Sequence, residues 1–348
     1  MSDPKNFKFC LKVVINKQKT KVLYAEADSD FTDVLLSFLT LPLGTIVKVL
    51  GKHYGDEAPV VGSLTSLYNG LSSLDGAHFC TESGKQMLLN PRNSSITECR
   101  KLKLNIDDTR HTKYFICRAI DLRGSKTGGV DDGYDGVFTS SKLYFIITDD
   151  LQVLPSGAGY AIQIIRNLGI TDTNGTEVRD VTFGFNEVME LLKGSFLSKT
   201  PLTDLVLKER QMDFVTVKCE IGTLLVGQIE KQTCSTAKKM TVKVILQEST
   251  NKLLFAEVED DFVEFLFSFL TIPLGGVECL LDGRTSKLKN IENLYRSISH
   301  YYRNRILRRF LNRLCIHRLK NGFFYGGFQN RLKKWGFLRR FLKNRRRN

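Results

Sequence analysis

The sequence predicts an α+β protein built from a duplicated β-hairpin-plus-helix domain, its second copy truncated and followed by a basic amphipathic helical tail. Residues 11–50 and 242–281 align without gaps at an offset of 231 positions, and 17 of the 40 pairs are identical. In both copies, short runs of branched and aromatic residues give way to apolar residues at helical spacing. After residue 298 the sequence contains basic and aromatic residues but no Asp or Glu.

The first copy begins with two short apolar runs, residues 11–15 and 21–25, which the polar residues 16–20 separate. This arrangement is typical of a β-hairpin. Asp28, Ser29 and Asp30 then supply candidate N-cap side chains and negative charge for a helix N-terminus. A helix is predicted from residue 31 and ends before Pro42, which disfavours helical backbone at the preceding residue. A second short helix is predicted to begin within residues 46–50.

The middle of the chain mixes predicted strands and helices. Apolar runs at residues 102–106, 114–117 and 143–148 predict strands, and residues 161–168 and 186–197 predict helices. The polar residues 228–239 are predicted to contain a domain boundary.

The formal charge of +14 belongs to the end of the chain. Sixteen of the 51 Lys and Arg residues lie in residues 299–348, so 35 basic side chains face 37 acidic ones in the rest. This distribution excludes a basic nucleic-acid-binding fold for residues 1–298. No stretch reaches the roughly 18 apolar residues of a transmembrane segment, and no secretory signal is visible. We expect an intracellular protein of the cytoplasm or nucleus, not a secreted one, with its eight cysteines reduced.

Several longer motifs accompany the repeat: DFTDVLLSFLTLPLGTIV, LLNPRNSS, LKLNIDD, KYFIC, FIITDDLQV and SKTPLTDLVL. Together they resemble the plant family called domain of unknown function 674, over about residues 7–298. The resemblance implies that the hairpin-plus-helix unit occurs twice, and it implies no reaction. We expect a first family domain at 7–230 (repeat unit 11–74 plus an α/β middle region), a partial second copy at 240–298, and a tail unlike the family at 299–348.

Two acidic pairs follow predicted strands, where carboxylates can act in acid–base catalysis or bind metal ions. They are Asp107–Asp108 and Asp149–Asp150. The same dipeptides are also ordinary turn and helix-cap residues. No basic or nucleophilic partner is identifiable for either pair, so the structural interpretation is favoured and no residue is assigned as catalytic.

Four residues could supply soft ligands to zinc: His78, Cys80, Cys99 and Cys117. The chain contains no C-x-x-C pair, and the spacing of His78 and Cys80 is too tight for a usual chelating turn. Buried cysteines acting as small apolar side chains are the favoured explanation of the pattern.

Gly157-x-Gly159 follows a predicted strand but lacks the rest of a nucleotide-binding motif. We therefore predict neither a metal nor a cofactor.

The tail contains basic residues interleaved with apolar ones at helical spacing. Its candidate binding residues are Arg308, Arg309, Lys333, Lys334, Trp335, Arg339 and Arg340. Such a pattern suits an anionic membrane surface, calmodulin or RNA. Translated non-coding sequence with chance amphipathicity, as from a gene-model error, would give the same pattern, so both interpretations stay open.

The favoured hypothesis is a non-catalytic module that binds an unidentified protein partner, in which the two SFLTxPLG segments pack internally. The alternatives are an enzyme that uses the four aspartates in one cleft and a protein whose tail binds membrane, calmodulin or RNA.

Overall fold

The computed structural model describes residues 6–79, 81–107, 137–139, 143–167, 176–207, 240, 242–247, 250, 252–281 and 288–301. Within these residues there is a five-stranded antiparallel sheet of order β4-β3-β2-β1-β5 and a separate two-stranded antiparallel sheet, β6-β7. The strands are β1 (Phe9–Ile15), β2 (Val22–Asp28), β3 (Tyr144–Thr148), β4 (Val153–Pro155), β5 (Glu177–Phe183), β6 (Val242–Leu246) and β7 (Leu253–Val258). The predicted α+β class is confirmed.

The predicted repeat is also confirmed. In the first copy the β1–β2 hairpin leads into α1 (Ser29–Ser37), the 3₁₀-helix η2 (Phe38–Thr40), α2 (Leu43–Tyr54), η3 (Gly55–Glu57) and α3 (Gly62–Ser73). In the second copy the β6–β7 hairpin leads into α9 (Asp260–Ser268), η5 (Phe269–Thr271), α10 (Leu274–Leu281) and α11 (Lys289–Tyr301). Both hairpins shift register at equivalent positions, between Val14 and Ile15 and between Ile245 and Leu246. The repeated sequence therefore specifies the same local structure twice.

The remaining helices come from the middle of the chain. They are η4 (Gly76–His78), α4 (Glu82–Leu89), α5 (Ile96–Cys99), α6 (Ala158–Asn167), α7 (Phe185–Leu197) and α8 (Pro201–Leu207). The predictions of β3, α6 and α7 are confirmed, and α2 begins earlier than predicted, directly after Pro42. The strand predicted at residues 102–106 is wrong: this segment buries Leu102, Leu104 and Ile106 without forming a strand. The strand predicted at 114–117 and the boundary at 228–239 lie outside the described residues.

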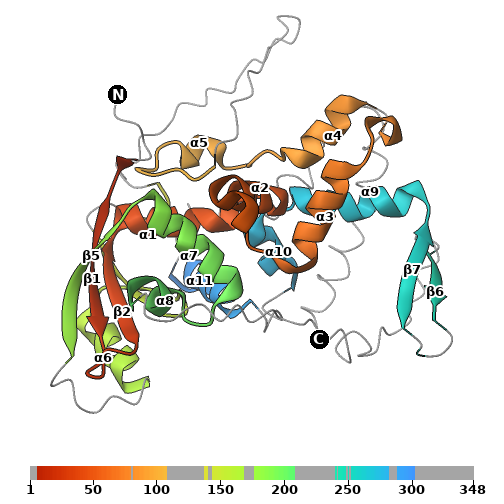
Figure 1. The fold of residues 1–348 in the computed structure, drawn as a ribbon. Helices are drawn as coiled ribbons and strands as arrows, with labels where there is room; N and C mark the ends of the chain where they lie inside the picture. The colour runs from red at the N-terminus through yellow and green to blue at the C-terminus, as the bar shows by residue number, and fades with distance from the viewer. Residues whose placement is uncertain are drawn as a thin grey trace, which may run out of the picture.

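The main core lies between the five-stranded sheet and the helices of both copies. Asp28 starts α1 by accepting a hydrogen bond from the Phe31 backbone N–H at 2.9 Å. This directs Phe31 into the core, where its ring makes edge-to-face contacts with Phe9 and Phe183 at centroid distances of 5.4 Å each. In Figure 1 the helices α7, α8 and α11 lie on the side of this sheet that faces the centre of the molecule.

The two copies meet through their equivalent SFLTxPLG segments, which pack internally as expected. Leu43 N donates to Ile272 O and Leu274 N donates to Leu41 O, both at 2.9 Å. Between these bonds, Pro42 and Pro273 form an antiparallel bridge. Since Pro273 is the counterpart of Pro42, the contact pairs each segment with its own repeat about a local pseudo-two-fold axis, like an isologous dimer interface within one chain.

Close packing at this junction requires a small residue at Gly44. A Cβ added there would lie 3.2 Å from Leu270 O and 3.3 Å from Leu270 Cβ, tighter than ordinary contacts. Around the same axis α2 contacts η5 and α10 contacts η2. As a result, the two hairpins extend on opposite sides of the molecule (Figure 1).

Candidate functional site

Asp149 is a structural carboxylate at the turn between β3 and β4. Its two oxygens accept hydrogen bonds from the backbone N–H and the hydroxyl of Thr203 at 2.9 and 2.8 Å. The same hydroxyl accepts from the Val22 N–H at 2.9 Å, so the three residues join α8 to the start of β2. Burial raises the pKa of Asp149 to about 6, against the opposing effect of the Thr203 hydrogen bonds and of the Lys21 charge. The Asp149 carboxylate and the Thr203 hydroxyl are therefore both hydrogen-bonded within the chain, and these bonds hold α8 in place.

Asp150 is held in a different way. Its carboxylate accepts from the Thr148 hydroxyl at 2.7 Å and lies 2.9 Å from Lys289 Nζ at the start of α11. Burial alone would raise the pKa of Asp150, but these two partners outweigh burial and the pKa is lowered. Asn293 adds a hydrogen bond to the Asp150 carbonyl oxygen at 2.9 Å. The turn that contains the acidic pair therefore fixes the position of the second-copy helix α11.

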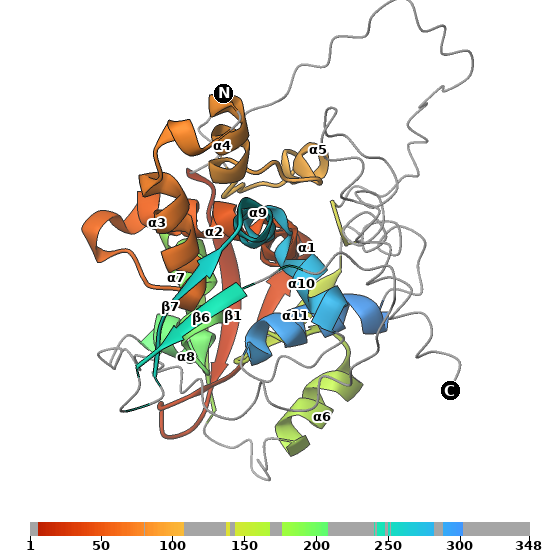
Figure 2. The same ribbon diagram turned by 90° about the vertical axis from the view of Figure 1, so that its right-hand side faces the viewer.

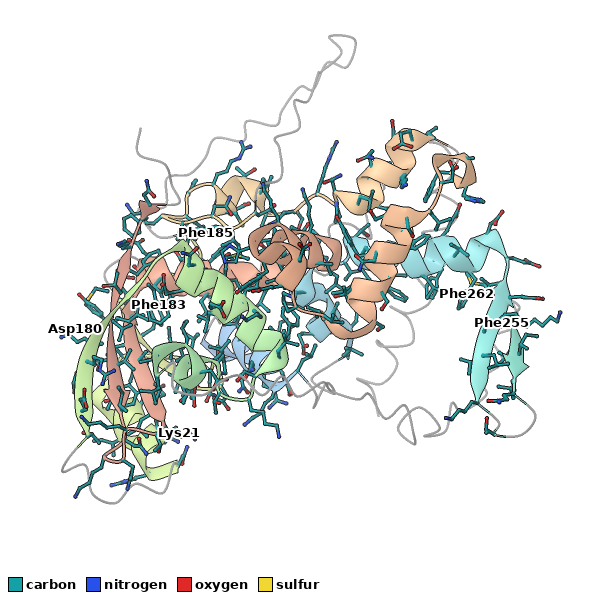
Figure 3. All side chains as sticks on the ribbon, viewed as in Figure 1. Lys21, Asp180, Phe183, Phe185, Phe255 and Phe262 are labelled. Carbon is teal, nitrogen blue, oxygen red and sulfur yellow. The ribbon has the colours of Figure 1, made fainter. Side chains whose placement is uncertain are left out.

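Asp107 lies near the opposite end of the sheet, and Asp108 is outside the described residues. The negative charge of Asp107 acts on the buried thiol of Cys99 in α5, whereas Asp149 interacts with Lys21. Helix α5 and the labelled Lys21 lie at opposite ends of the first sheet (Figures 1 and 3). The structure therefore does not bring Asp107 into one cleft with Asp149 and Asp150.

A further carboxylate, Asp33 on α1, also has a structural role. It accepts hydrogen bonds from the backbone N–H groups of Val137 and Thr139 at 2.7 and 2.8 Å. Burial raises the pKa of Asp33 to about 6, although hydrogen bonds from Thr139 and Val137 oppose the rise. Like Asp149, it fixes a distant segment of backbone to the hairpin-plus-helix unit.

The candidate zinc ligands that the structure describes are not gathered together. His78 is exposed on η4, whereas Cys99 is buried next to the Thr40 hydroxyl at 3.5 Å. Burial raises the pKa of the Cys99 thiol to about 12, so the sulfur stays protonated and packs as a small apolar side chain. Cys80 and Cys117 lie outside the described residues. In the part of the chain that is described, no three His, Cys, Asp or Glu side chains are grouped to hold a metal ion.

Three other predictions bear on the site and its surroundings. The seven tail residues proposed for binding, from Arg308 to Arg340, all lie outside the described residues. Among the described helices, none has both the length and the apolar composition needed to cross a bilayer. Cys279 on α10 is disulfide-bonded, so the expectation that every cysteine is reduced is wrong for this residue.

The most unusual surface of the described structure is the β6–β7 hairpin, which the sequence patterns did not single out. Its apolar side chains are exposed, with fractions of 64% for Leu253, 57% for Leu254, 55% for Phe255 and 50% for Val244. The counterparts of Leu253, Leu254 and Val244 in the first copy are buried, with 0% for Val22, 4% for Leu23 and 0% for Val13, whereas Tyr24, the counterpart of Phe255, is partly buried. The same apolar pattern therefore forms a core in one copy and a surface in the other.

The neighbouring strands explain the difference. In the first copy β5 covers the outer edge of β1 and β3 covers the outer edge of β2. Within the described residues β6 and β7 pair only with each other, which leaves a main-chain edge on each strand open. Figure 2, viewed from the side of the second copy, shows this hairpin in front of the first sheet, and Figure 3 shows Phe255 on it. An open edge flanked by exposed apolar side chains can accept an additional strand.

A sequence signal for this surface does exist. The hairpin pattern occurs twice, but the residues that supply β3, β4, α7 and β5 occur between the copies and are not repeated in the residues described after β7. One set of covering elements cannot complete two hairpins.

Comparison with known proteins gives one family. Residues 5–127 and 120–335 both match the family model described as a protein of unknown function, DUF674. The two matches agree with the internal repeat, and the second extends past residue 298, where the motif resemblance ended. No curated protein and no solved structure matches the chain.

Proposed function

We propose that this chain, which belongs to the DUF674 family, is a non-catalytic protein-interaction module that binds an extended polypeptide segment along β6–β7. The observation that carries the proposal is the exposure of Leu253, Leu254 and Phe255 on a strand whose first-copy counterpart is covered. Exposed apolar clusters on a soluble fold mark interaction sites. Here the cluster also adjoins an open main-chain edge, which favours strand addition as the mode of binding.

The acidic residues support a non-catalytic role. Asp33 and Asp149 each accept two hydrogen bonds from distant segments of the same chain, and Asp150 is paired with Lys289. A general acid or base must reach a substrate with its carboxylate oxygens. The oxygens of these three side chains are instead used to hold α8, α11 and residues 137–139.

The occupied edge in the first copy indicates what the open edge can bind. On β2, Ala25 pairs with Ile147, Glu26 with Ile146 and Ala27 with Phe145 in an antiparallel ladder. The equivalent residues of β7 are Ala256, Glu257 and Val258, which conserve the small and acidic character of the first two positions. A segment with the apolar composition of β3 should therefore fit against β7.

The test uses a synthetic peptide that copies residues 143–150 of this chain, LYFIITDD, with two added N-terminal lysines and a fluorescent label. We expect saturable binding to the full chain in fluorescence anisotropy. Phe255→Asp should weaken binding about tenfold or more, because it places a charge on the apolar strand and removes its largest side chain.

Val178→Asp is the matched control. Val178 is 63% exposed on β5, so this variant introduces the same charge on a strand edge of the other sheet. Its affinity for the peptide should equal that of the unmodified chain, and a scrambled peptide should not bind. Absence of saturable binding, or equal loss with both variants, would contradict the proposed function.

A further inference from the structure

We infer that the occupant of the β7 edge is β7 of a second copy of this chain, which gives a symmetric dimer with a four-stranded sheet of order β6-β7-β7-β6. This inference rests on the proposed function and identifies its partner. Three observations support it. The edge of β7 is open and apolar, the described residues hold two repeated hairpins but only one set of covering strands, and the composition of β7 is similar to that of a covering strand.

Within the described residues each chain holds two copies of the repeated hairpin, β1–β2 and β6–β7, but one set of covering strands, which the first copy uses in full. Among the described strands of a second molecule, β3 is paired on both sides, β4 is only three residues long, and β5 carries charged residues along its sequence EVRDVTF. The apolar edge that a second molecule offers without unfolding is therefore that of its own β6–β7 hairpin, and the two equivalent edges can pair with each other.

The composition of β7 is similar to that of β3, the strand that pairs with the equivalent edge in the first copy. The occupant of the equivalent first-copy edge, β3, is an antiparallel strand with the sequence YFIIT. Strand β7, LLFAEV, has the same kind of composition: consecutive apolar residues with one polar group near its end. Pairing of the two edges would bring Leu253, Leu254 and Phe255 of one copy against β7 of the other, and these are the most exposed large apolar side chains of the hairpin.

Charge and shape select one register. When the two β7 strands are antiparallel and centred on Phe255, the two Phe255 rings are directly opposite, an aromatic pair that stabilises sheets. Leu254 then faces Ala256, and Glu257 faces Leu253, so the two Glu257 carboxylates lie at opposite ends of the ladder. Each Glu257 keeps its ion pair with Lys243 of its own chain, at 2.8 Å. The molecule already uses self-pairing of this kind where Pro42 meets Pro273.

The first experiment measures the mass of the full chain in solution over a range of concentrations by sedimentation equilibrium. We expect a concentration-dependent rise from 39.5 kDa to twice that value. Phe255→Asp should keep the chain at the monomer mass throughout, and Val178→Asp should behave like the unmodified chain. A chain that stays monomeric, or a dimer unaffected by Phe255→Asp, would overturn the inference. Because Phe255 is 55% exposed, an unchanged unfolding midpoint checks that its replacement leaves the fold intact.

The second experiment tests the register by disulfide trapping under a mild thiol oxidant. In Phe255→Cys the two sulfurs of a dimer would lie within disulfide reach, because directly opposite residues have Cα atoms about 4.5–5.5 Å apart. In Leu253→Cys the same residues would be about 13 Å apart along the strands and should not cross-link. We expect a covalent dimer from the first variant and none from the second or from the unmodified chain. Equal cross-linking of both variants would contradict this register.

The two proposals can fail separately. The β3 peptide should compete with the second copy and dissociate the dimer. Peptide binding that depends on Phe255 by a chain that is always monomeric would support strand addition and overturn the dimer. A dimer that forms without Phe255 and does not respond to the peptide would contradict both.

Discussion

A chain that ends at residue 239 is expected to lose cooperative folding, although it contains the whole five-stranded sheet. The reason is that the second copy completes the core of the first: Leu274, Ile291, Leu294 and Ile298 are fully buried in the main core. Burial of each such side chain contributes about 1.5–3 kcal/mol, so together they approach the whole stability of a typical domain, about 5–15 kcal/mol. The Ser297 hydroxyl also accepts the Val153 N–H at 2.8 Å.

The matched control removes the hairpin and keeps the second-copy helices. Residues 242–258 are replaced by a short Gly-Ser linker, so α9, α10 and α11 remain. The deleted side chains are mostly exposed, and we expect the free energy of unfolding to change by about 1 kcal/mol or less. Both variants are measured by urea unfolding followed by circular dichroism. Cooperative unfolding of the chain ending at 239, with an unchanged midpoint, would show that the first copy folds independently.

Phe31→Ala is expected to lower the free energy of unfolding by about 3–5 kcal/mol. Phe31 is 1% exposed and contacts the rings of Phe9 and Phe183, so its removal leaves a large cavity that rigid neighbours cannot fill. Its counterpart in the second copy is Phe262, which is only partly buried and whose ring lies 6.4 Å from that of Phe265.

Phe262→Ala, the same change at the equivalent position, should therefore cost about 1 kcal/mol. Figure 3 labels Phe262 at the start of α9, next to the open hairpin. Urea unfolding of the two variants under identical conditions gives the comparison directly. Equal destabilisation would mean that the second hairpin is packed as tightly as the first.

The repeated local structure was predictable because its signals lie close together in the sequence. Polar residues 16–20, the Asp28 cap and the Pro42 boundary fix β1, β2 and α1 without reference to distant segments. Strand β5 was missed for a physical reason: its sequence EVRDVTF is largely exposed, and its place in the sheet depends on pairing from Phe9 with Phe183 to Ile15 with Glu177. Propensity carries no information about such long-range partners.

The roles of the candidate site residues depended on contacts that spacing cannot reveal. Asp149 is fixed by Thr203, 54 positions later, and Asp150 by Lys289. For the hairpins the limit is different, because the apolar pattern is nearly the same in both copies. The sequence shows two apolar hairpins. Only the three-dimensional packing shows that β3 and β5 pair with the first hairpin and not with the second.

The measurement that tests this account most directly is residue-resolved hydrogen exchange of the equivalent amides in the two copies. The N–H groups of Leu43 and Leu274, which bond across the pseudo-two-fold axis, should be slow and similar. Amides of β1, which has partners on both sides, should exchange about a hundredfold or more slowly than their counterparts in β6, whose outer edge has no partner strand among the described residues and stays unpaired when a second molecule binds β7. Equal protection of β1 and β6, or fast exchange at Leu43 and Leu274, would contradict a paired duplication with one covered and one open hairpin.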